Sequence, residues 1–194
     1  VRLGLDSVEH AYTLSDETCR MMAEKGTFLT PTLVVSHCND YLKKHGSAEW
    51  HLRKQAAAAQ EHIRSCRRAV QAGVTICTGT DLLPSDPIDG TTPTVRETEL
   101  LVEDVGMTPL QAIRCATRNG AELCGVLAET GTLEPGKLGD FLIVEGRPDE
   151  NVRDLRNLRL VSKGCRLVKS DLPAIPKQNF NPMMAGVPCD GGTF

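Results

Sequence analysis

Residues 72–81 read Ala-Gly-Val-Thr-Ile-Cys-Thr-Gly-Thr-Asp, and this stretch decides the fold. Gly73 is typical of the residue that ends a helix. Residues 74–78 form a short apolar run that predicts a buried strand. The strand runs directly into Gly79-Thr80-Asp81. A helix, then a buried strand, then polar residues at the end of the strand is the repeating unit of an α/β protein.

Two further strands are expected on the N-terminal side of this unit. Residues 1–10 end in an alternation of apolar and polar residues, with His10 at its end. Residues 27–35, TFLTPTLVV, are apolar and β-branched and predict a second buried strand. Pro31 lies inside this run, so we expect a bulge or an early end of the strand pairing there.

Helices are expected between and after the strands, because capping residues stand at their ends. Ser15, followed by two acidic residues, predicts a helix start, and Gly26 predicts its end. Thr108 followed by Pro109 predicts another start, and Asn119 is expected to cap one more short helix. The expected helices cover residues 16–25, 51–72, 94–105 and 109–118, with loops at residues 37–50 and 82–93.

The order of these elements up to about residue 120 is strand, helix, strand, helix, strand, helix. This alternation predicts a parallel sheet covered by helices, either doubly wound or barrel-like. Three strands do not close a barrel, and an open sheet of this kind would expose a hydrophobic edge. Since the chain opens at Val1 rather than at a methionine, we interpret it as a fragment or a processed product. No glycine-rich phosphate-binding motif follows a strand, so nothing in the sequence indicates nucleotide binding.

The pattern changes from Gly131 onward. Glycines separate short apolar runs, which predicts a small β-region instead of another strand and helix. Those runs are residues 141–144, 158–161 and 165–168. We therefore divide the chain into residues 1–128, a partial (β/α) barrel; residues 129–170, small β-strands; and residues 171–194, an irregular tail.

Composition excludes several classes of function. The chain has 194 residues, of which 40% are hydrophobic and 24% charged, and its net charge is −3. This is an ordinary globular composition, without the basic surface of a nucleic-acid-binding protein or an apolar run long enough to span a membrane. Eight cysteines are scattered without a Cys-x-x-Cys pair, which favours reduced thiols in a cytoplasmic protein over thiolate metal ligands.

Two of the three predicted strands end in a residue that can bind a metal ion. His10 ends the first strand and Asp81 ends the third, 81 − 10 = 71 residues later. In barrel enzymes the carboxyl ends of the strands form the active site, and imidazole and carboxylate are usual ligands of zinc. Each residue also has a structural alternative: a hydrogen-bonded histidine at the rim, or an aspartate that caps a turn. His37 follows the second strand and is a candidate for contact with a substrate.

Three local patterns resemble the C-terminal half of the amidohydrolase superfamily. They are Ser7-Val8-Glu9-His10, the stretch from Ala72 to Asp81, and Gly131-Thr-Leu-Glu-Pro-Gly-Lys-Leu-Gly-Asp140, in this order. The segment that begins Met107-Thr108-Pro109 is similar to the helices after the last barrel strand of the same family. Within the superfamily the chain most resembles the branch of imidazolonepropionase-like hydrolases, Xaa-Pro dipeptidases and ochratoxin-hydrolysing amidases.

The resemblance implies a (β/α)8 barrel, of which this chain supplies strands 6–8, and a small β-sandwich built from both chain ends. It also implies one or two divalent metal ions, zinc first among them. His10 matches the metal ligand after strand 6. Asp81 matches the catalytic aspartate after strand 8, which binds metal and carries a proton from water to the leaving amine. Thr32, His37 and Leu82 are expected to contact the substrate.

The sequence also departs from the family pattern. The family's His-x-His after strand 1, its carboxylated lysine or glutamate after strand 4, and its histidine after strand 5 have no counterpart here. Ala11 stands where the family has a glycine. We therefore expect a hydrolase of C–N bonds in an amide or dipeptide, with a chain that is incomplete for catalysis on its own. The alternatives are an inactive structural or interaction fragment and a deaminase; a homo-oligomer is left open.

Overall fold

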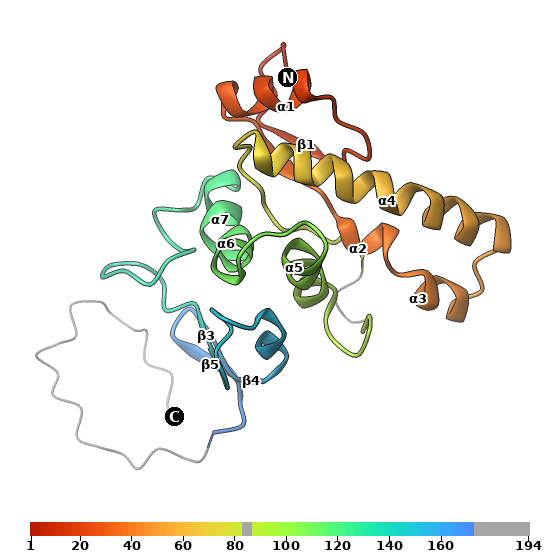
Figure 1. Ribbon diagram of the computed structural model, residues 1–194. Coiled ribbons are helices and arrows are strands. Elements are labelled where there is room, and N and C mark those ends of the chain that lie inside the picture. Colours follow the sequence, from red (N-terminus) through yellow and green to blue (C-terminus); the bar gives the residue numbers. More distant parts are fainter. Residues whose placement is uncertain (83–86, 173–194) are drawn as a thin grey trace, which may run out of the picture.

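The computed structural model describes residues 1–82 and 87–172 and shows a mixed α/β chain (Figure 1). Residues 83–86 of the loop and residues 173–194 of the tail lie outside the described residues, as do the predictions for them. The elements are β1 (Ser7–Glu9), α1 (Asp16–Lys25), β2 (Phe28–Thr30), α2 (Leu33–Ser36), α3 (Asn39–Lys44), α4 (Glu49–Gln71), α5 (Pro93–Glu103), α6 (Pro109–Arg114), the π-helical turn η1 (Cys115–Asn119), α7 (Gly120–Leu123), β3 (Phe141–Val144), the 3₁₀ turn η2 (Val152–Arg156), β4 (Leu158–Lys163) and β5 (Arg166–Ser170).

Two of the three strands predicted in the first part of the chain form a parallel pair, and the third segment joins them through one bridge. β1 pairs with β2, with Val8 opposite Leu29. Leu29 also bridges in parallel to Ile76. In this bridge the Leu29 N–H donates to the Thr75 carbonyl and the Cys77 N–H donates to the Leu29 carbonyl, each at 2.9 Å. The parallel arrangement is confirmed for β1 and β2, while the predicted strand at residues 74–78 is reduced to the parallel bridge at Ile76. The three segments run in the same direction and therefore end at the same edge.

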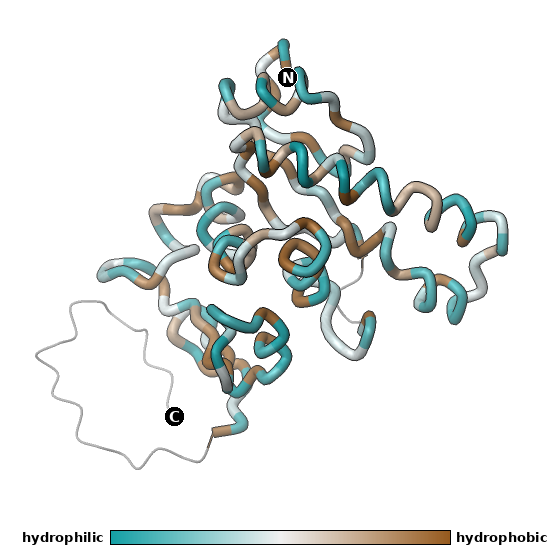
Figure 2. Tube along the Cα trace, viewed as in Figure 1, coloured by the Kyte–Doolittle hydropathy of each residue, from teal (hydrophilic) through white to brown (hydrophobic). Residues whose placement is uncertain are grey.

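The two faces of this small sheet differ in their cover. On one face Leu29 and Ile76 are buried and Val8 packs against them, in a core shared with α1, α4 and α5. Figure 2 shows the apolar segments of α2 and α5 in the interior beside α4, while α3 and the outer turns of α4 are largely hydrophilic. On the other face Glu9 is exposed and Phe28 is half-buried. Since alternate residues of a strand point to opposite faces, the helices cover the face of Leu29, whereas the opposite face is exposed at Glu9 but buried at Thr30 and Cys77.

Both predicted ends of α1 are confirmed. The Ser15 hydroxyl accepts the N–H of Thr18, and Gly26 adopts a left-handed conformation with φ 68°. A residue with a Cβ is disfavoured in that conformation. The chain can therefore turn directly from α1 into β2, which keeps the helix on the covered face of the sheet.

The prediction of one strand over residues 27–35 is wrong in its second half. β2 ends at Thr30, and Leu33–Ser36 form the short helix α2. Pro31 has no N–H for the ladder, and Thr32 turns the chain with φ 53°. The helix is then stabilised by a distant residue, since the Glu97 carboxylate accepts the N–H groups of Leu33 at 2.9 Å and Val34 at 2.7 Å.

The short helix predicted after Asn119 is present as α7, but the Asn119 side chain does not cap it. The helix that starts with the Thr108 capping box continues through η1 into α7 without a break at Asn119. The side chain of Asn119 instead donates to the carbonyl of Ile76 at 2.8 Å. A π-helical turn widens the helix locally, and here it carries a side chain that holds the third parallel strand.

The C-terminal β-region forms a three-stranded antiparallel sheet in the order β3-β4-β5, close to the three predicted runs. The turn η2 between β3 and β4 was not predicted. Its Arg156 makes a two-point ion pair with Glu99 of α5, at 2.6 Å and 2.7 Å, and the Glu99 side chain is 0% exposed. This ion pair attaches η2, and with it the small sheet, to α5.

Two general predictions can be compared with the described residues. All seven cysteines within residues 1–82 and 87–172 are free, and five of them are buried. No helix in the described ranges is long and apolar enough to cross a bilayer.

Candidate functional site at the strand ends

The three parallel strands are each followed by a residue in an uncommon backbone conformation. His10 has φ 64°, Thr32 has φ 53° and Asp81 has φ 51°. Residues other than glycine rarely adopt positive φ because the Cβ is crowded. Such strain persists only where surrounding contacts impose it, and it gathers at functional sites. The three residues mark one edge of the sheet as the candidate site.

The His10 imidazole is held by Thr32. Its Nδ1 lies 2.8 Å from the Thr32 hydroxyl, and its backbone N–H donates to the Thr30 carbonyl at 2.9 Å. The other ring nitrogen, Nε2, makes no hydrogen bond with the described residues. A histidine fixed through one nitrogen in this way presents the other to a ligand in a defined direction. Thr32 is buried, and its hydroxyl is hydrogen-bonded to the His10 ring.

A second, buried histidine supports the backbone of His10. The His62 Nε2 donates to the His10 carbonyl at 2.9 Å, and its Nδ1 lies 2.8 Å from the Ser36 hydroxyl. Burial lowers the pKa of His62, which favours the neutral ring that this pattern of one donor and one acceptor requires. Tyr12 stacks on the same ring, with centroids 4.1 Å apart.

Sequence reasoning assigned His62 no role, although a signal was present. Four and seven residues after His62 come Cys66 and Ala69, which are buried on α4. Since helical residues at these spacings share one face, the apolar stripe places His62 on the buried side of the helix. Its hydrogen-bond partner, the His10 carbonyl, lies 52 residues earlier in the chain and cannot be inferred from this local pattern.

Asp81 is exposed at the end of the third strand. A Cβ at Gly79 would lie 2.4 Å from the Thr30 Cγ2 and 3.6 Å from the Thr32 Cγ2, so only glycine fits where this strand passes the end of β2. The pKa of Tyr12 is raised by burial first and then by the charges of Cys38 and Asp81.

The other two residues expected to contact a substrate also lie near this edge. The His37 Nδ1 donates to the Leu33 carbonyl at 2.9 Å at the end of α2. Leu82 is partly buried, and its N–H donates to the Thr80 hydroxyl at 3.4 Å. Both contacts are local, and neither identifies a ligand.

The buried carboxylate of Glu97 fixes the helix that follows Thr32. Burial raises the pKa of Glu97 to about 7, while the two backbone N–H groups that it accepts lower it. A charge without a counterion in a buried site is costly. Since the group connects α5 to the start of α2, it helps to define where Thr32 can lie.

The donor set can be compared with the needs of a metal ion. His10 and Asp81 supply one imidazole and one carboxylate, the right types for zinc. The buried Thr30 hydroxyl at the same edge has no hydrogen-bond partner among the residues described. However, no group of three or more histidine, cysteine, aspartate or glutamate side chains that could hold a metal occurs within residues 1–82 and 87–172. Catalytic zinc sites usually have about three protein ligands, so these two fit in type and fall short in number.

Comparison with known proteins gives consistent results. The model of the amidohydrolase family matches residues 2–193. The ochratoxinase of Aspergillus niger is 32% identical over 173 residues, which cover 87% of this chain and 35% of the relative. The imidazolonepropionase of Geobacillus kaustophilus is 32% identical over 143 residues, covering 73% of this chain and 28% of the relative.

Solved structures agree in fold. A Xaa-Pro dipeptidase with methionine bound in its active site superimposes with a TM-score of 0.73 at 29% identity, covering 87% of this chain and 41% of that one. The A. niger ochratoxinase structure gives a TM-score of 0.71 at 32% identity, covering 88% and 38%. The chain thus spans about a third of the length of its curated relatives. With a family model that matches almost every residue, the chain belongs to the amidohydrolase family.

Proposed function

We propose that this chain forms strands 6–8 of a (β/α)8 barrel, and part of a small β-sandwich, in a metal-dependent hydrolase that cleaves C–N bonds. The observation that carries the proposal is the common edge at which His10, Thr32 and Asp81 follow three parallel strands with positive φ. In this proposal His10 and Asp81 bind a divalent ion, with zinc the first to be tested. Its remaining ligands lie outside the described residues.

The chemistry follows from the two side chains. A bound divalent ion lowers the pKa of water to about 7 and polarises a carbonyl oxygen. With such an ion held there, Asp81 would accept a proton from water at the site and donate it to the nitrogen that leaves, which a carboxylate beside the reacting atoms can do. His10 keeps its ligand direction because Thr32 holds the opposite ring nitrogen.

The substrate class in this proposal is an amide or a dipeptide. Two of the proteins similar to this chain are named as an ochratoxinase and a Xaa-Pro dipeptidase. Thr32, His37 and Leu82 line the entrance to the site. The similarity to imidazolonepropionase keeps a cyclic amide, or deamination of a ring, as an alternative within the family. The free cysteines favour a cytoplasmic setting.

A second candidate function is an inactive interaction fragment. It is favoured by the two-donor site and by exposed apolar residues on the small sheet, Leu142, Leu167 and Val168. Exposed patches of this kind often mark protein–protein contacts. A stable, metal-free oligomer of the 194-residue chain in light scattering would support this candidate.

The test measures metal content and turnover in two proteins, the 194-residue chain and a version extended by its upstream coding sequence. Substrates are N-acyl amino acids, X-Pro dipeptides and a cyclic amide. We expect the extended protein to copurify with a divalent ion and to hydrolyse at least one of these classes. An extended protein with neither metal nor turnover refutes the hydrolase proposal.

A further inference from the structure

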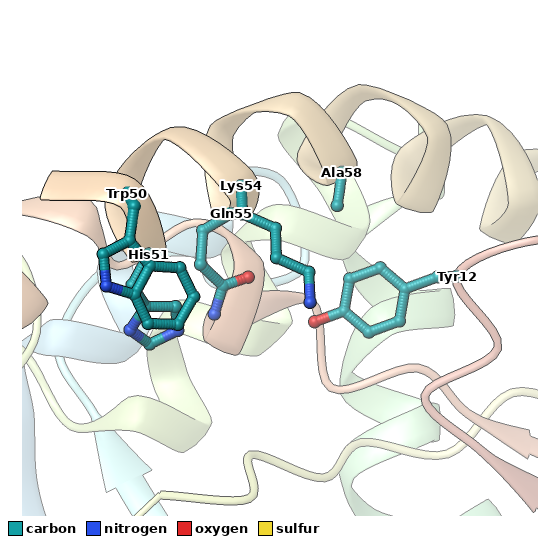
Figure 3. A pocket seen from close by; sticks show the side chains of 6 residues that line it. All are labelled: Tyr12, Trp50, His51, Lys54, Gln55 and Ala58. Carbon is teal, nitrogen blue, oxygen red and sulfur yellow. The ribbon is translucent and has the colours of Figure 1, made fainter. Parts of the chain in front are cut away.

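A groove of ≈ 490 Å³ opens beside the candidate site. It lies along the first turns of α4 and is closed on one side by Tyr12 (Figure 3). The lining residues are Tyr12, Trp50, His51, Lys54, Gln55 and Ala58. The volume falls within the range of small-molecule pockets, about 300–1,000 Å³. The groove is therefore large enough to hold part of a small substrate.

The groove is continuous with the strand ends through Tyr12. This residue comes two positions after His10 and stacks on His62, whose Nε2 donates to the His10 carbonyl. A molecule that rests on Tyr12 thus lies beside the segment that carries His10, one of the two proposed metal ligands.

The chemistry of the lining is an aromatic surface with one cation. Trp50 is the single tryptophan of the chain and is 64% exposed, which is unusual for so large an apolar side chain. Lys54 makes no ion pair with any residue in the described ranges. Figure 3 shows its ammonium between Gln55 and Tyr12, on the groove side of the helix. An ammonium beside the Tyr12 ring, with Trp50 farther along the groove beyond Gln55, is complementary to an anion that carries an apolar group.

We infer that this groove binds the carboxylate end of the substrate, with Lys54 pairing to the carboxylate and Trp50 and Tyr12 packing against an adjacent aryl or aliphatic group. The inference rests on the proposed function, since it assigns the substrate a free carboxylate near the bond that is cleaved. It names Lys54 as the residue that selects acids over neutral amides.

The lone tryptophan supplies the readout. N-acetyl-phenylalanine is titrated into the 194-residue chain while Trp50 fluorescence is recorded, and the uncharged N-acetyl-phenylalaninamide is titrated in parallel. We expect a saturable change with the acid and about tenfold weaker binding of the carboxamide, because a charge-assisted contact is lost. Lys54→Gln should weaken binding of the acid by about the same factor and leave the carboxamide unchanged.

Arg53→Gln is the matched control, since it removes one positive charge from the neighbouring, exposed position of α4. Equal binding of acid and carboxamide, or equal effects of Lys54→Gln and Arg53→Gln, overturns the inference. Metal content and turnover are measured on the extended protein with the same variants. Absent turnover with Lys54-dependent binding refutes the hydrolase proposal alone, whereas turnover that is indifferent to Lys54→Gln refutes the groove alone.

Discussion

The buried His62 ring donates its Nε2 hydrogen to the carbonyl of His10 across 2.9 Å. This contact connects the middle of α4 to the residue that follows β1, which has a φ of 64°. The same ring contacts Ser36 at the end of α2. His62 of α4 thus supports the edge of the sheet through hydrogen bonds to both β1 and α2.

His62→Leu should destabilise the fold by about 1–3 kcal/mol, because the Ser36 hydroxyl and the His10 carbonyl lose a buried partner. The free energy of unfolding in urea measures the effect. His45→Leu is the control, since His45 is exposed at the end of α3 and its Nδ1 bonds locally to the Tyr41 carbonyl. A loss no greater for His62→Leu than for His45→Leu would contradict the structural role.

Glu97 should make stability depend on pH. Its pKa is about 7 in the fold against an ordinary value of 4.5. The folded state therefore holds the proton more tightly, and the stabilisation present below pH 4.5 is lost as the pH rises through 7. The loss is on the order of 3 kcal/mol.

Unfolding in urea at several pH values between these limits tests this prediction. Glu97→Gln should be less stable overall, because an amide cannot accept the N–H groups of both Leu33 and Val34, and its stability should change less with pH. Glu49→Gln, at an exposed position of α4, is the control. A pH profile of Glu97→Gln that parallels the unchanged protein would refute the assignment.

Arg156→Met should loosen the attachment of the small sheet. It leaves the fully buried Glu99 with only Arg96, whose guanidinium lies 3.2 Å away. We expect a loss of about 2–4 kcal/mol, since a buried charge is left partly unpaired. Arg147→Met, an exposed ion pair with Asp149, should change stability by less than about 1 kcal/mol. Similar losses in both variants would show that the Glu99 pair does not hold the two parts together.

Local patterns predicted those parts of the fold that depend on neighbours in sequence. The Ser15 and Thr108 caps and the glycine end of α1 all involve contacts within a few residues. The first two apolar runs form a parallel pair and the third joins it at one bridge, because burial on the helix side fixes their pairing. Each of these features depends on residue types and spacings that the amino-acid sequence displays directly.

The features that escaped prediction depend on distant partners. The β-branched composition of residues 33–36 favours a strand, but the carboxylate that makes them helical lies 64 residues away at Glu97. Asn119 has the residue type of a cap, and its side chain acts on Ile76, 43 residues earlier. The places of His10 and Asp81 after strands are visible in the sequence, whereas the support from Thr32 and His62 arises only in three dimensions.

Thr32→Val tests the support of the proposed metal ligand. It removes the hydroxyl at the His10 Nδ1 with little change in volume. The metal affinity of the extended protein should fall by about 10–100-fold, the usual cost of losing such a contact. Competition with a chelating dye measures it. Thr94→Val, on the exposed first turn of α5, serves as the control. Equal affinity of Thr32→Val and the unchanged protein would show that Thr32 does not orient a metal ligand.

The most direct test of the central claim is the zinc content of the extended protein after dialysis, in the unchanged form and in His10→Asn and Asp81→Asn. If both side chains bind one ion at the strand ends, each substitution lowers the zinc content and abolishes turnover, while His45→Asn retains both. Full zinc content in His10→Asn and Asp81→Asn would contradict the account, because the ion would then be bound elsewhere.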